Sequence, residues 1–424
     1  MAAASPGADR DTIFALSSGA PPAAIAVVRI SGPKAISAAN FLTNMNFAPR
    51  QATLAVLRDD DTELDTALVL TFPAPASATG EDIAELHLHG GRATIAAVLE
   101  VLAKTPGLRP AEPGEFTRRA FANGRMDLNE AEGLADLLAA ETESQRRAAL
   151  AMAGGTLTRL IAGWRTQIID AAARLEAAID YDGEDDILPW ASRADDLEVL
   201  AAEIEASLAA PPAERLRDGL RVVIAGPPNA GKSTLFNALA GRDAAIVSDQ
   251  AGTTRDVIEA PVRLGDVALL LTDTAGLRDA SSDAIEVEGM RRADQAMAAA
   301  DLVLWLGDGP GPDGATKVTA KADLGASGSG LCISAHSGEG MAALRALLLN
   351  KARDGQRDDG LTLNQRQRAA LSEIVNHVRA AAIAELLVAA EELRVARMAL
   401  DRLQGRSGVE DMLDALFSRF CLGK

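Results

Sequence analysis

The stretch RVVIAGPPNAGKSTLFNALAG, residues 221–241, decides the fold of the central part of the chain. Its residues 222–225 are apolar and predict a buried strand, which leads into GPPNAGKS, residues 226–233, and then into a helical pattern. Glycines let successive backbone N–H groups turn inward around a polyanion, at the positive end of the following helix. A glycine-rich turn could carry Lys-Ser by accident, but the order of strand, loop and helix favours a phosphate-binding loop in an α/β nucleotide-binding domain.

The side chains of this loop and of the motifs after it indicate which nucleotide binds. Lys232 is expected to reach the β- and γ-phosphates, and Ser233 to ligate Mg²⁺. Asp273 ends an apolar run in VALLLTDTAG, where it can hold Mg²⁺ through water, and the N–H of Gly276 can sense the γ-phosphate. Asp323 in AKAD can accept hydrogen bonds from N1–H and the 2-amino group of guanine, a pairing that adenine cannot make. The order of these motifs predicts a GTPase rather than an ATPase.

Two further segments and Lys321 of AKAD complete the nucleotide-binding pattern. GTTRD, residues 252–256, lies where a switch loop with an Mg²⁺-binding threonine, Thr254, is expected. Lys321 would pack across the base and ribose, and ISA, residues 333–335, follows in the expected order.

Two positions depart from the pattern that many GTPases share. Ala320 stands where the guanine-reading motif normally begins with Asn, so specificity is expected to rest on Asp323 and affinity to be weaker. Leu277 follows DTAG, where many small GTPases place the glutamine that orients the attacking water, and leucine cannot do this. The enzyme must therefore position water and neutralise the charge of the transition state by other means.

The composition is that of a multidomain globular protein in a reducing compartment. The chain has 424 residues, 48% of them hydrophobic and 24% charged, which predicts two or three domains. Its two cysteines, Cys332 and Cys421, exclude a disulfide framework. The first residues lack the pattern of a secretory signal, and no apolar run reaches the ~18 residues of a membrane span. We therefore expect a cytoplasmic protein that does not enter a membrane.

The formal net charge of −18 limits how the chain can contact nucleic acid. A protein that holds RNA mainly through phosphate contacts needs a basic face, which this total does not favour. If RNA is a substrate, a second protein is expected to supply much of the contact.

The patterns along the chain predict a multidomain fold with α+β, all-α and α/β parts. Residues 1–125 mix strands and turns and predict an α+β domain, whereas residues 126–215 carry apolar positions at helical spacing. Residues 216–355 alternate strand and helix, as in a parallel sheet, and residues 356–424 return to the helical pattern. Because amphipathic helices need partners for their apolar faces, the α/β domain is expected to be inserted into one helical domain built from both flanks.

Five segments together resemble one known family. They are GPPNAGKSTLFNALAGRDAAIVSDQAGTTRDV, TDTAGLRD, TGEDIAELHLHGG, PGEFTRRAF and the terminal FCLGK. In sequence and order they are similar to the tRNA modification GTPases MnmE, also called TrmE, and the similarity covers essentially the whole chain.

The resemblance implies a function in tRNA modification. Members of this family form homodimers and work in a heterotetramer with MnmG, a flavoprotein that depends on FAD and NADH. The complex installs a carboxymethylaminomethyl or aminomethyl group on C5 of the wobble uridine of certain tRNAs. The resemblance further implies that residues 1–125 mediate dimerisation and bind the one-carbon donor, a 5,10-methylene- or 5-formyl-tetrahydrofolate derivative.

For the G domain, the resemblance implies a Ras-like P-loop fold whose GTP hydrolysis depends on K⁺ and on pairing of two G domains. K⁺ then stands in for an arginine finger, which answers the question that Leu277 raises. The positions that match the K⁺ ligands are Asn229, Ser248, Gln250 and Thr253. Glu286 matches the glutamate that positions water, with Glu288 as the close competitor.

The motifs and the resemblance together define the candidate nucleotide site. The GTP-binding residues are Asn229, Ala230, Gly231, Lys232, Ser233, Thr234, Ser248, Thr253, Thr254, Asp273, Gly276, Lys321, Asp323, Ser334 and Ala335.

For the folate, the resemblance implies a site built from Arg29, Glu85, Arg125 and Lys424, with Arg125 where Lys is expected. A pterin needs a carboxylate for its 2-amino group and N3–H, and the glutamate tail of a folate needs cations. Arg125 keeps the positive charge of Lys but differs from it in shape and in donor geometry.

The terminal FCLGK is not a lipidation box, because Gly423 is not aliphatic and Lys424 is a poor final residue for one. An apolar stripe at helical spacing leads up to Phe420 and predicts an anchored helix rather than a frayed tail. The resemblance places the tail at the folate pocket and implicates Cys421 in the modification, as nucleophile, acid or structural group. We therefore expect the two ends of the chain to meet at one site.

Other functions are less well supported. An Era-like regulatory GTPase of ribosome assembly would carry a basic RNA-binding domain, which the composition does not show. A stand-alone folate-dependent transferase would have no use for the G domain. His87 and His89 have the spacing of a metal site, but a structural or ligand-lining role is favoured because no third ligand lies near them in sequence.

Overall fold

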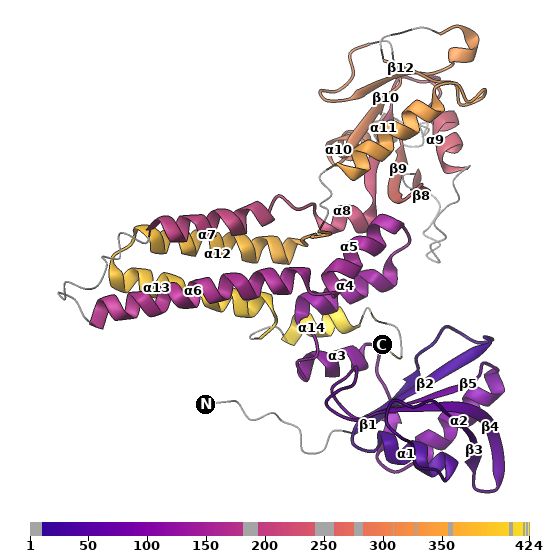
Figure 1. Cartoon of the computed structure of the whole chain (residues 1–424). Coiled ribbons are helices and arrows are strands. Elements are labelled where there is room, and N and C mark those ends of the chain that lie inside the picture. Colours follow the sequence, from indigo (N-terminus) through magenta and orange to yellow (C-terminus); the bar gives the residue numbers. More distant parts are fainter. Residues whose placement is uncertain are drawn as a thin grey trace. The chain divides into compact units, whose positions relative to one another are not determined.

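The fold is that of a computed structural model of the whole chain (Figure 1). The residues it describes are 11–180, 194–241, 258–274, 283–307, 309–326, 328, 330–354, 359–406, 410–418, 420 and 423. They form two compact units, each described here by itself. The N-terminal unit comprises Met1–Ala135 with Asp401–Lys424, and the central unit comprises Asp136–Leu400.

The N-terminal unit contains a six-stranded sheet in the order β3-β4-β5-β2-β1-β6. All paired neighbours are antiparallel except β1 and β6, which run parallel. The strands are β1 (Thr12–Leu16), β2 (Ile25–Ser31), β3 (Thr53–Asp59), β4 (Thr62–Phe72), β5 (Ile83–His89) and β6 (Leu108–Pro110). Two helices, α1 (Ala35–Thr43) and α2 (Arg92–Lys104), cover one face of the sheet.

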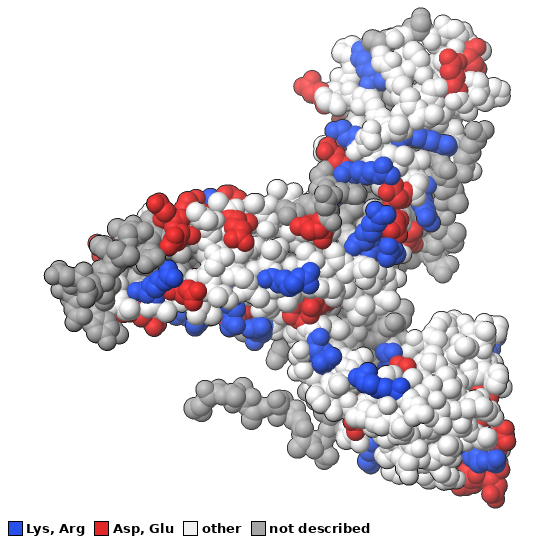
Figure 2. Space-filling view, in the orientation of Figure 1, with Lys and Arg blue, Asp and Glu red and all other residues white. Residues whose placement is uncertain are grey.

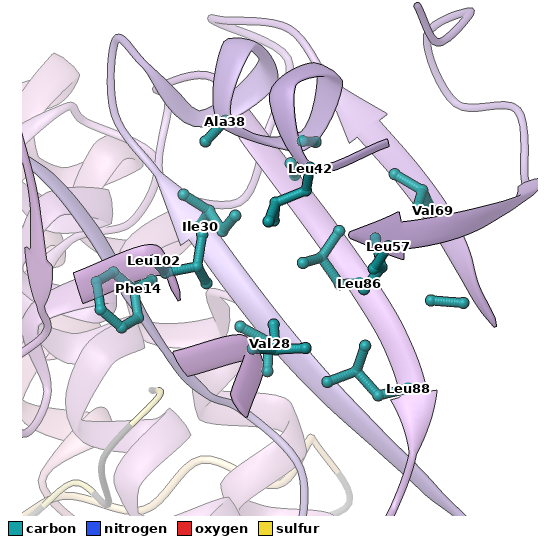
Figure 3. Packing of buried hydrophobic residues seen from close by; sticks show 14 of the residues in the cluster. Phe14, Val28, Ile30, Ala38, Leu42, Leu57, Val69, Leu86, Leu88 and Leu102 are labelled. Atoms are coloured by element: carbon teal, nitrogen blue, oxygen red, sulfur yellow. The ribbon is translucent and has the colours of Figure 1, made fainter. Parts of the chain in front are cut away.

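Alternation along the strands decides which face of this sheet is buried. Leu86 and Leu88 of β5 lie in one core with Val28 of β2, and they pack under Leu42 of α1 and Leu102 of α2 (Figure 3). Burying one such side chain stabilises the fold by about 1.5–3 kcal/mol. Glu85 and His87, which alternate with these leucines in β5, are only half buried and point to the other face.

A second core of the N-terminal unit joins the two ends of the chain. It is built by α3 (Glu115–Ala122), the start of α4 (Leu128–Ala139) and α14 (Glu410–Phe417). The buried side chains in it are Leu128, Ala131, Leu416, Phe417 and Phe420. Because the apolar stripe of α14 finds its partners here, residues 401–424 group with the N-terminal residues, although the sequence pattern places all of 356–424 in one helical domain.

A buried ionic network holds α3 to the sheet. Arg119, 7% exposed, donates hydrogen bonds to Glu81 at 3.1 Å and to Glu115 at 2.9 Å. Arg109 donates to both carboxylate oxygens of Glu115, at 2.9 and 2.7 Å. Burial raises the pKa of Glu115, but the hydrogen bonds from Arg109, from the backbone N–H of Glu112 and from Arg119 outweigh it and hold that pKa at about 2.

The central unit contains a second six-stranded sheet, in the order β12-β11-β10-β7-β9-β8. Its paired strands are parallel except β8, which runs antiparallel to β9. The strands are β7 (Leu220–Ala225), β8 (Ile258–Leu264), β9 (Val267–Asp273), β10 (Leu302–Trp305), β11 (Thr316–Thr319) and β12 (Leu331–Cys332). Its helices are α9 (Lys232–Ala240), α10 (Asp283–Ala298), α11 (Met341–Arg353) and the short 3₁₀ helix η2 (Ala322–Leu324). The expected α/β domain is confirmed.

Helices from before and after this sheet domain pack on each other, as expected for an inserted domain. They are α5 (Glu143–Ala153), α6 (Thr156–Asp180), α7 (Ala194–Ser207), α8 (Ala213–Asp218), α12 (Gln365–Ile383) and α13 (Leu386–Leu403). α7 and α12 lie side by side (Figure 1), and Arg379 of α12 pairs with Glu198 and Glu205 of α7. Within the described residues, none of the helices has the length and apolar character that crossing a bilayer requires.

The two connections into the sheet domain are bonded to each other. The N–H of Ala213 donates to the carbonyl of Leu363 at 3.1 Å, and the N–H of Leu363 donates to the carbonyl of Pro211 at 3.3 Å. Arg368 of α12 donates to the carbonyl oxygens of Leu208, at 2.8 Å, and Ala210. The chain therefore enters and leaves the sheet domain at one place, which keeps the helical part continuous across the insertion.

The network around Glu115 predicts a stability that depends on pH. Its pKa falls from an ordinary 4.5 to about 2 in the folded chain, so its contribution is complete above 4.5 and is lost as the pH falls through about 2. Hydrogen exchange of the β1 and α3 amides, measured from pH 7 down to about pH 2, should show local unfolding becoming easier across that window. Glu115→Gln should flatten this dependence; an equally steep fall in the variant would contradict the account.

Candidate functional site

The phosphate loop lies between β7 and α9 in the central unit. β7 is a central strand, paired in parallel with β9 and β10, and its residues are buried except for Arg221. Gly226 has a φ of +150°, and a Cβ there would overlap the carbonyl oxygen of Leu306. Gly231 caps α9 with a φ of +95°. Glycine is therefore required where the loop leaves the strand and where it enters the helix.

Lys232, the first residue of α9, lies inside the loop. Its side chain is 6% exposed, and Nζ donates to the carbonyl oxygens of Gly226 at 3.1 Å and Pro227 at 2.9 Å. Burying an ammonium costs free energy unless its charge is compensated, and here the carbonyl oxygens of the loop compensate it. The N-terminus of α9 adds the positive end of its dipole and carries no acidic residue in its first turn. The loop thus presents an ammonium and backbone donors to an anion.

Asp273 lies where the sequence predicts a Mg²⁺-holding carboxylate. It ends β9, is 2% exposed and pairs in register with Ile224 near the end of β7. The hydroxyl of Thr274 donates to the carbonyl of Ile224 at 3.0 Å, which fixes the segment after β9 against β7. Because parallel strands end at the same edge of a sheet, the register brings this carboxylate beside the phosphate loop.

The AKAD and ISA segments lie together at the same edge. The N–H of Ala322 donates to the carbonyl of Ile333 at 3.1 Å, and Ser334 is 1% exposed. Lys321 has a φ of +62°, and its ammonium donates to the carbonyl of Asn229 in the phosphate loop at 2.9 Å. Asp323 lies exposed on η2. The side chain that could read guanine and the loop that could hold its phosphates are therefore linked through Lys321.

Ala320 has no polar side-chain atom that could bond the phosphate loop, so the hydrogen bond from Lys321 to Asn229 gains importance. Its Cβ lies 3.5 Å from the position that a Cβ on Gly231 would take, so the methyl group packs against the loop without a polar atom to hold it. An amide at this position could have bonded the loop; in this chain Lys321 donates a hydrogen bond to the loop. Sequence reasoning identified the missing amide but not this contact.

Several predicted residues fall outside the described part of the chain. They are Ser248, Gln250, Thr253, Thr254, Gly276, Cys421 and Lys424, together with the side chain of Glu286. Their assignments stay predictions. The remaining loop positions, Asn229, Ala230, Ser233 and Thr234, lie in the loop and the first turn of α9, and Ala335 follows Ser334.

In the N-terminal unit, Arg29 of β2 and Glu85 of β5 form an ion pair on the open face of the sheet. Nε and one terminal nitrogen of Arg29 lie 2.9 and 2.8 Å from Oε1 of Glu85. The two side chains are 24% and 18% exposed, and the guanidinium lies 5.8 Å from the ring centre of Phe116. Nε2 of His87 lies 3.5 Å from Oε2, the oxygen that Arg29 leaves open. The pair is held by these contacts and remains partly exposed to a ligand.

Gly423, the last described residue of the chain, lies at the end of β1, the strand that pairs with β2. Gly423 contacts Leu16 and Ser17 at the end of β1, and the next residue back, Ala15, pairs with Arg29 in register. Arg125 is exposed after α3, and its aliphatic carbons lie beside Gly80 in the loop before β5. No described contact joins Arg125 to Arg29 or Glu85.

The histidines of β5 do not form a metal site with described residues. His89 pairs with Asp65 at 2.7 Å, and His87 faces Glu85. Among the described residues, no group of three His, Cys, Asp or Glu side chains could hold a metal ion. What sequence reasoning missed is the Glu81–Arg119–Glu115 network behind this face, since its partners lie far apart in the chain.

The chain matches known proteins along nearly its whole length. Residues 12–125 match the family described as GTP-binding protein TrmE N-terminus, and residues 128–421 match the MnmE helical domain. A tRNA modification GTPase MnmE from Rhizorhabdus wittichii is 56% identical, over 99% of this chain and 98% of its own. Proteins of the same name from Novosphingobium aromaticivorans and Erythrobacter litoralis are 54% and 53% identical, each over 98% of this chain and 100% of their own.

Among solved structures, the G domain of the FeoB iron transporter of T. maritima is 24% identical over 31% of this chain and 98% of its own, with a TM-score of 0.23. A score this low supports no conclusion. The matches along nearly the whole chain do: this protein belongs to the MnmE, or TrmE, family of tRNA modification GTPases.

Proposed function

We propose that the chain is a K⁺-stimulated GTPase that works as a homodimer with the FAD- and NADH-dependent flavoprotein MnmG in the cytoplasm. In this heterotetramer it installs a carboxymethylaminomethyl or aminomethyl group on C5 of the wobble uridine of certain tRNAs, using a one-carbon tetrahydrofolate derivative. The observation that carries the GTPase part is the parallel register of β7 and β9, which puts Asp273 beside the loop that encloses Lys232. Family membership supports the coupling to tRNA.

The nucleotide site fits GTP with Mg²⁺. Lys232 would exchange its bonds to two loop carbonyls for β- and γ-phosphate oxygens, at no loss of compensation for its buried charge. Ser233 and Thr254 would ligate Mg²⁺ and Asp273 would hold its water, while Asp323 would read guanine. The metal supplies charge stabilisation for the transferred phosphoryl group.

Water positioning and charge compensation would come from residues other than Leu277. Asn229, Ser248, Gln250 and Thr253 would hold K⁺ near the phosphates, and Glu286 on α10 would orient the attacking water. Asn229 supports this assignment because it lies in the loop with a φ of +60°, its carbonyl engaged by Lys321. That bond fixes the backbone of Asn229 while leaving its side-chain amide to other partners.

The open face of the N-terminal sheet fits a reduced folate. Glu85 would accept from the 2-amino group and N3–H of a pterin through Oε2, because Arg29 occupies Oε1 and an ionised carboxylate has about four acceptor positions. Arg29 keeps the carboxylate oriented. Arg125 and Lys424 would supply cations for the glutamate tail, and Cys421 would take part in the transfer.

The surface supports a second protein as the main RNA contact. On the face drawn in Figure 2, Lys and Arg side chains lie among Asp and Glu side chains. The ion pairs of the described residues include Arg146 with Glu143, Arg353 with Asp266 and Arg215 with Asp301. Charges paired in this way attract phosphates weakly. The Era-like alternative is disfavoured by family membership.

K⁺ dependence is the first test of this proposal. GTP turnover of the purified chain should be at least about ten-fold faster in KCl than in NaCl, because a cation at the phosphates replaces an arginine finger. Asn229→Ala should remove that difference while the variant still binds GDP. Equal turnover of the wild-type chain in the two salts would refute the K⁺ mechanism.

The two cysteines separate the modification from GTP hydrolysis. Cys421→Ser should leave GTP turnover near the wild-type rate and abolish modification of tRNA by the purified chain with MnmG, GTP and the folate. Cys332 of β12 gives the matched control, since Cys332→Ser should retain both activities. Retained modification in Cys421→Ser would rule out a catalytic thiol.

A further inference from the structure

The C-terminal helix α14 contacts the N-terminal residues backbone to backbone. Gly114, the N-cap of α3, has a φ of +71°. A Cβ built on it would overlap the carbonyl oxygen of Phe417 and lie 2.9 Å from its carbonyl carbon and 3.0 Å from its Cα. These are backbone atoms, so no change of rotamer could relieve the clash. α14 therefore lies as close to α3 as it does only because residue 114 has no side chain.

Gly423 makes a contact of the same kind beyond the helix. Its φ is +90°, and a Cβ there would overlap the carbonyl oxygen of Leu16 and lie 2.8 Å from Cα of Ser17. Leu16 is the last residue of β1, next to the Ala15–Arg29 pair. The backbone of Gly423 therefore contacts the end of β1, one residue from Ala15, which pairs with Arg29 of β2.

Side-chain contacts with α3 also hold α14 in this position. The rings of Phe121 and Phe417 are 6.4 Å apart, and those of Phe417 and Phe420 are 6.1 Å apart. Arg118 lies over the ring of Phe417 at 5.6 Å and pairs with Asp414. These contacts anchor the helix, while the glycines set how closely it approaches.

The turn that receives α14 also supports the ligand site. Gly114 contacts Phe417, Glu115 binds Arg109 and Arg119, and Phe116 lies under the guanidinium of Arg29. Three consecutive residues thus connect the C-terminal helix, the buried network and the Arg29–Glu85 pair. A shift of α14 relative to this turn would shift the tail relative to Arg29.

We propose that Gly114 and Gly423 are positioning residues of the N-terminal ligand site. Gly114 sets the approach of α14 to α3, and Gly423 sets the approach of its own backbone to the end of β1, one residue from Ala15, which pairs with Arg29. The catalytic part of this inference rests on the proposed function, in which the tail serves a reduced folate.

The chain offers a matched control for the test. Gly124, at the other end of α3, has a φ of +66°, and a Cβ there would meet nothing within 4 Å. Alanine is disfavoured by a similar free energy at both glycines, because both have a positive φ. Gly114→Ala and Gly124→Ala therefore differ in the clash with Phe417, which only the first creates.

Hydrogen exchange of the full chain measures directly how firmly α14 packs on α3 and Gly423 on the end of β1. Gly114→Ala should speed exchange in α14 and at the end of β1, whereas Gly124→Ala should leave both at the wild-type rate. Gly423→Ala should speed exchange at the end of β1 but not in α14, and it serves if Gly114→Ala folds poorly. Equal exchange in Gly114→Ala and Gly124→Ala, or an unchanged β1 end in Gly423→Ala, would overturn the docking.

Kinetics test whether the docking positions reacting groups. The kcat of tRNA modification should fall at least about ten-fold in Gly114→Ala, because a misplacement of about 1 Å can cost that much or more. The KM for the folate should change less than kcat, since Arg29 and Glu85 remain, and GTP turnover should stay unchanged. Faster exchange with undiminished modification would overturn the positioning role. A wild-type chain that modifies no tRNA would overturn the proposed function and the catalytic part of this inference, while exchange would still decide the docking.

Discussion

The parallel pairing of β7 with β9 is the constraint on which the nucleotide site depends. It aligns Ile224 with Asp273, so the strand that carries the phosphate loop and the strand that carries the acidic residue end at one edge. β7 cannot shift its register by one residue without moving the exposed Arg221 into the buried position of Leu220 or Val222. The buried ammonium of Lys232 is held beside that edge by carbonyl oxygens of its own loop.

The N-terminal unit uses a different principle to build its site. Its sheet buries one face under α1 and α2, which leaves Arg29 and Glu85 on the other. That face acquires its surroundings from distant segments: α3 supplies Phe116, and Gly423 lies at the end of β1. A site assembled from both ends of a chain exists only in the folded protein, and anything that loosens the C-terminal helix would act on it.

Sequence reasoning worked where the signal is local and failed where the partners are distant. The strand at β5 follows from its alternation, and the phosphate loop from the spacing of Gly226, Gly231 and Lys232. The pairing of Arg119 with Glu81, 38 residues away, leaves no local pattern. The stripe of apolar residues predicts that α14 is anchored, and the structure adds its partners, which lie in α3 and at the start of α4.

The central claim is that the nucleotide site serves tRNA modification. It is tested most directly by nucleoside analysis of bulk tRNA from a strain that lacks this gene, carrying either the wild-type gene or Lys232→Ala. We predict that the C5 groups of wobble uridine are absent without the gene, return with the wild-type gene and stay absent with Lys232→Ala. Wobble uridines that are unchanged in the strain lacking the gene would contradict the account.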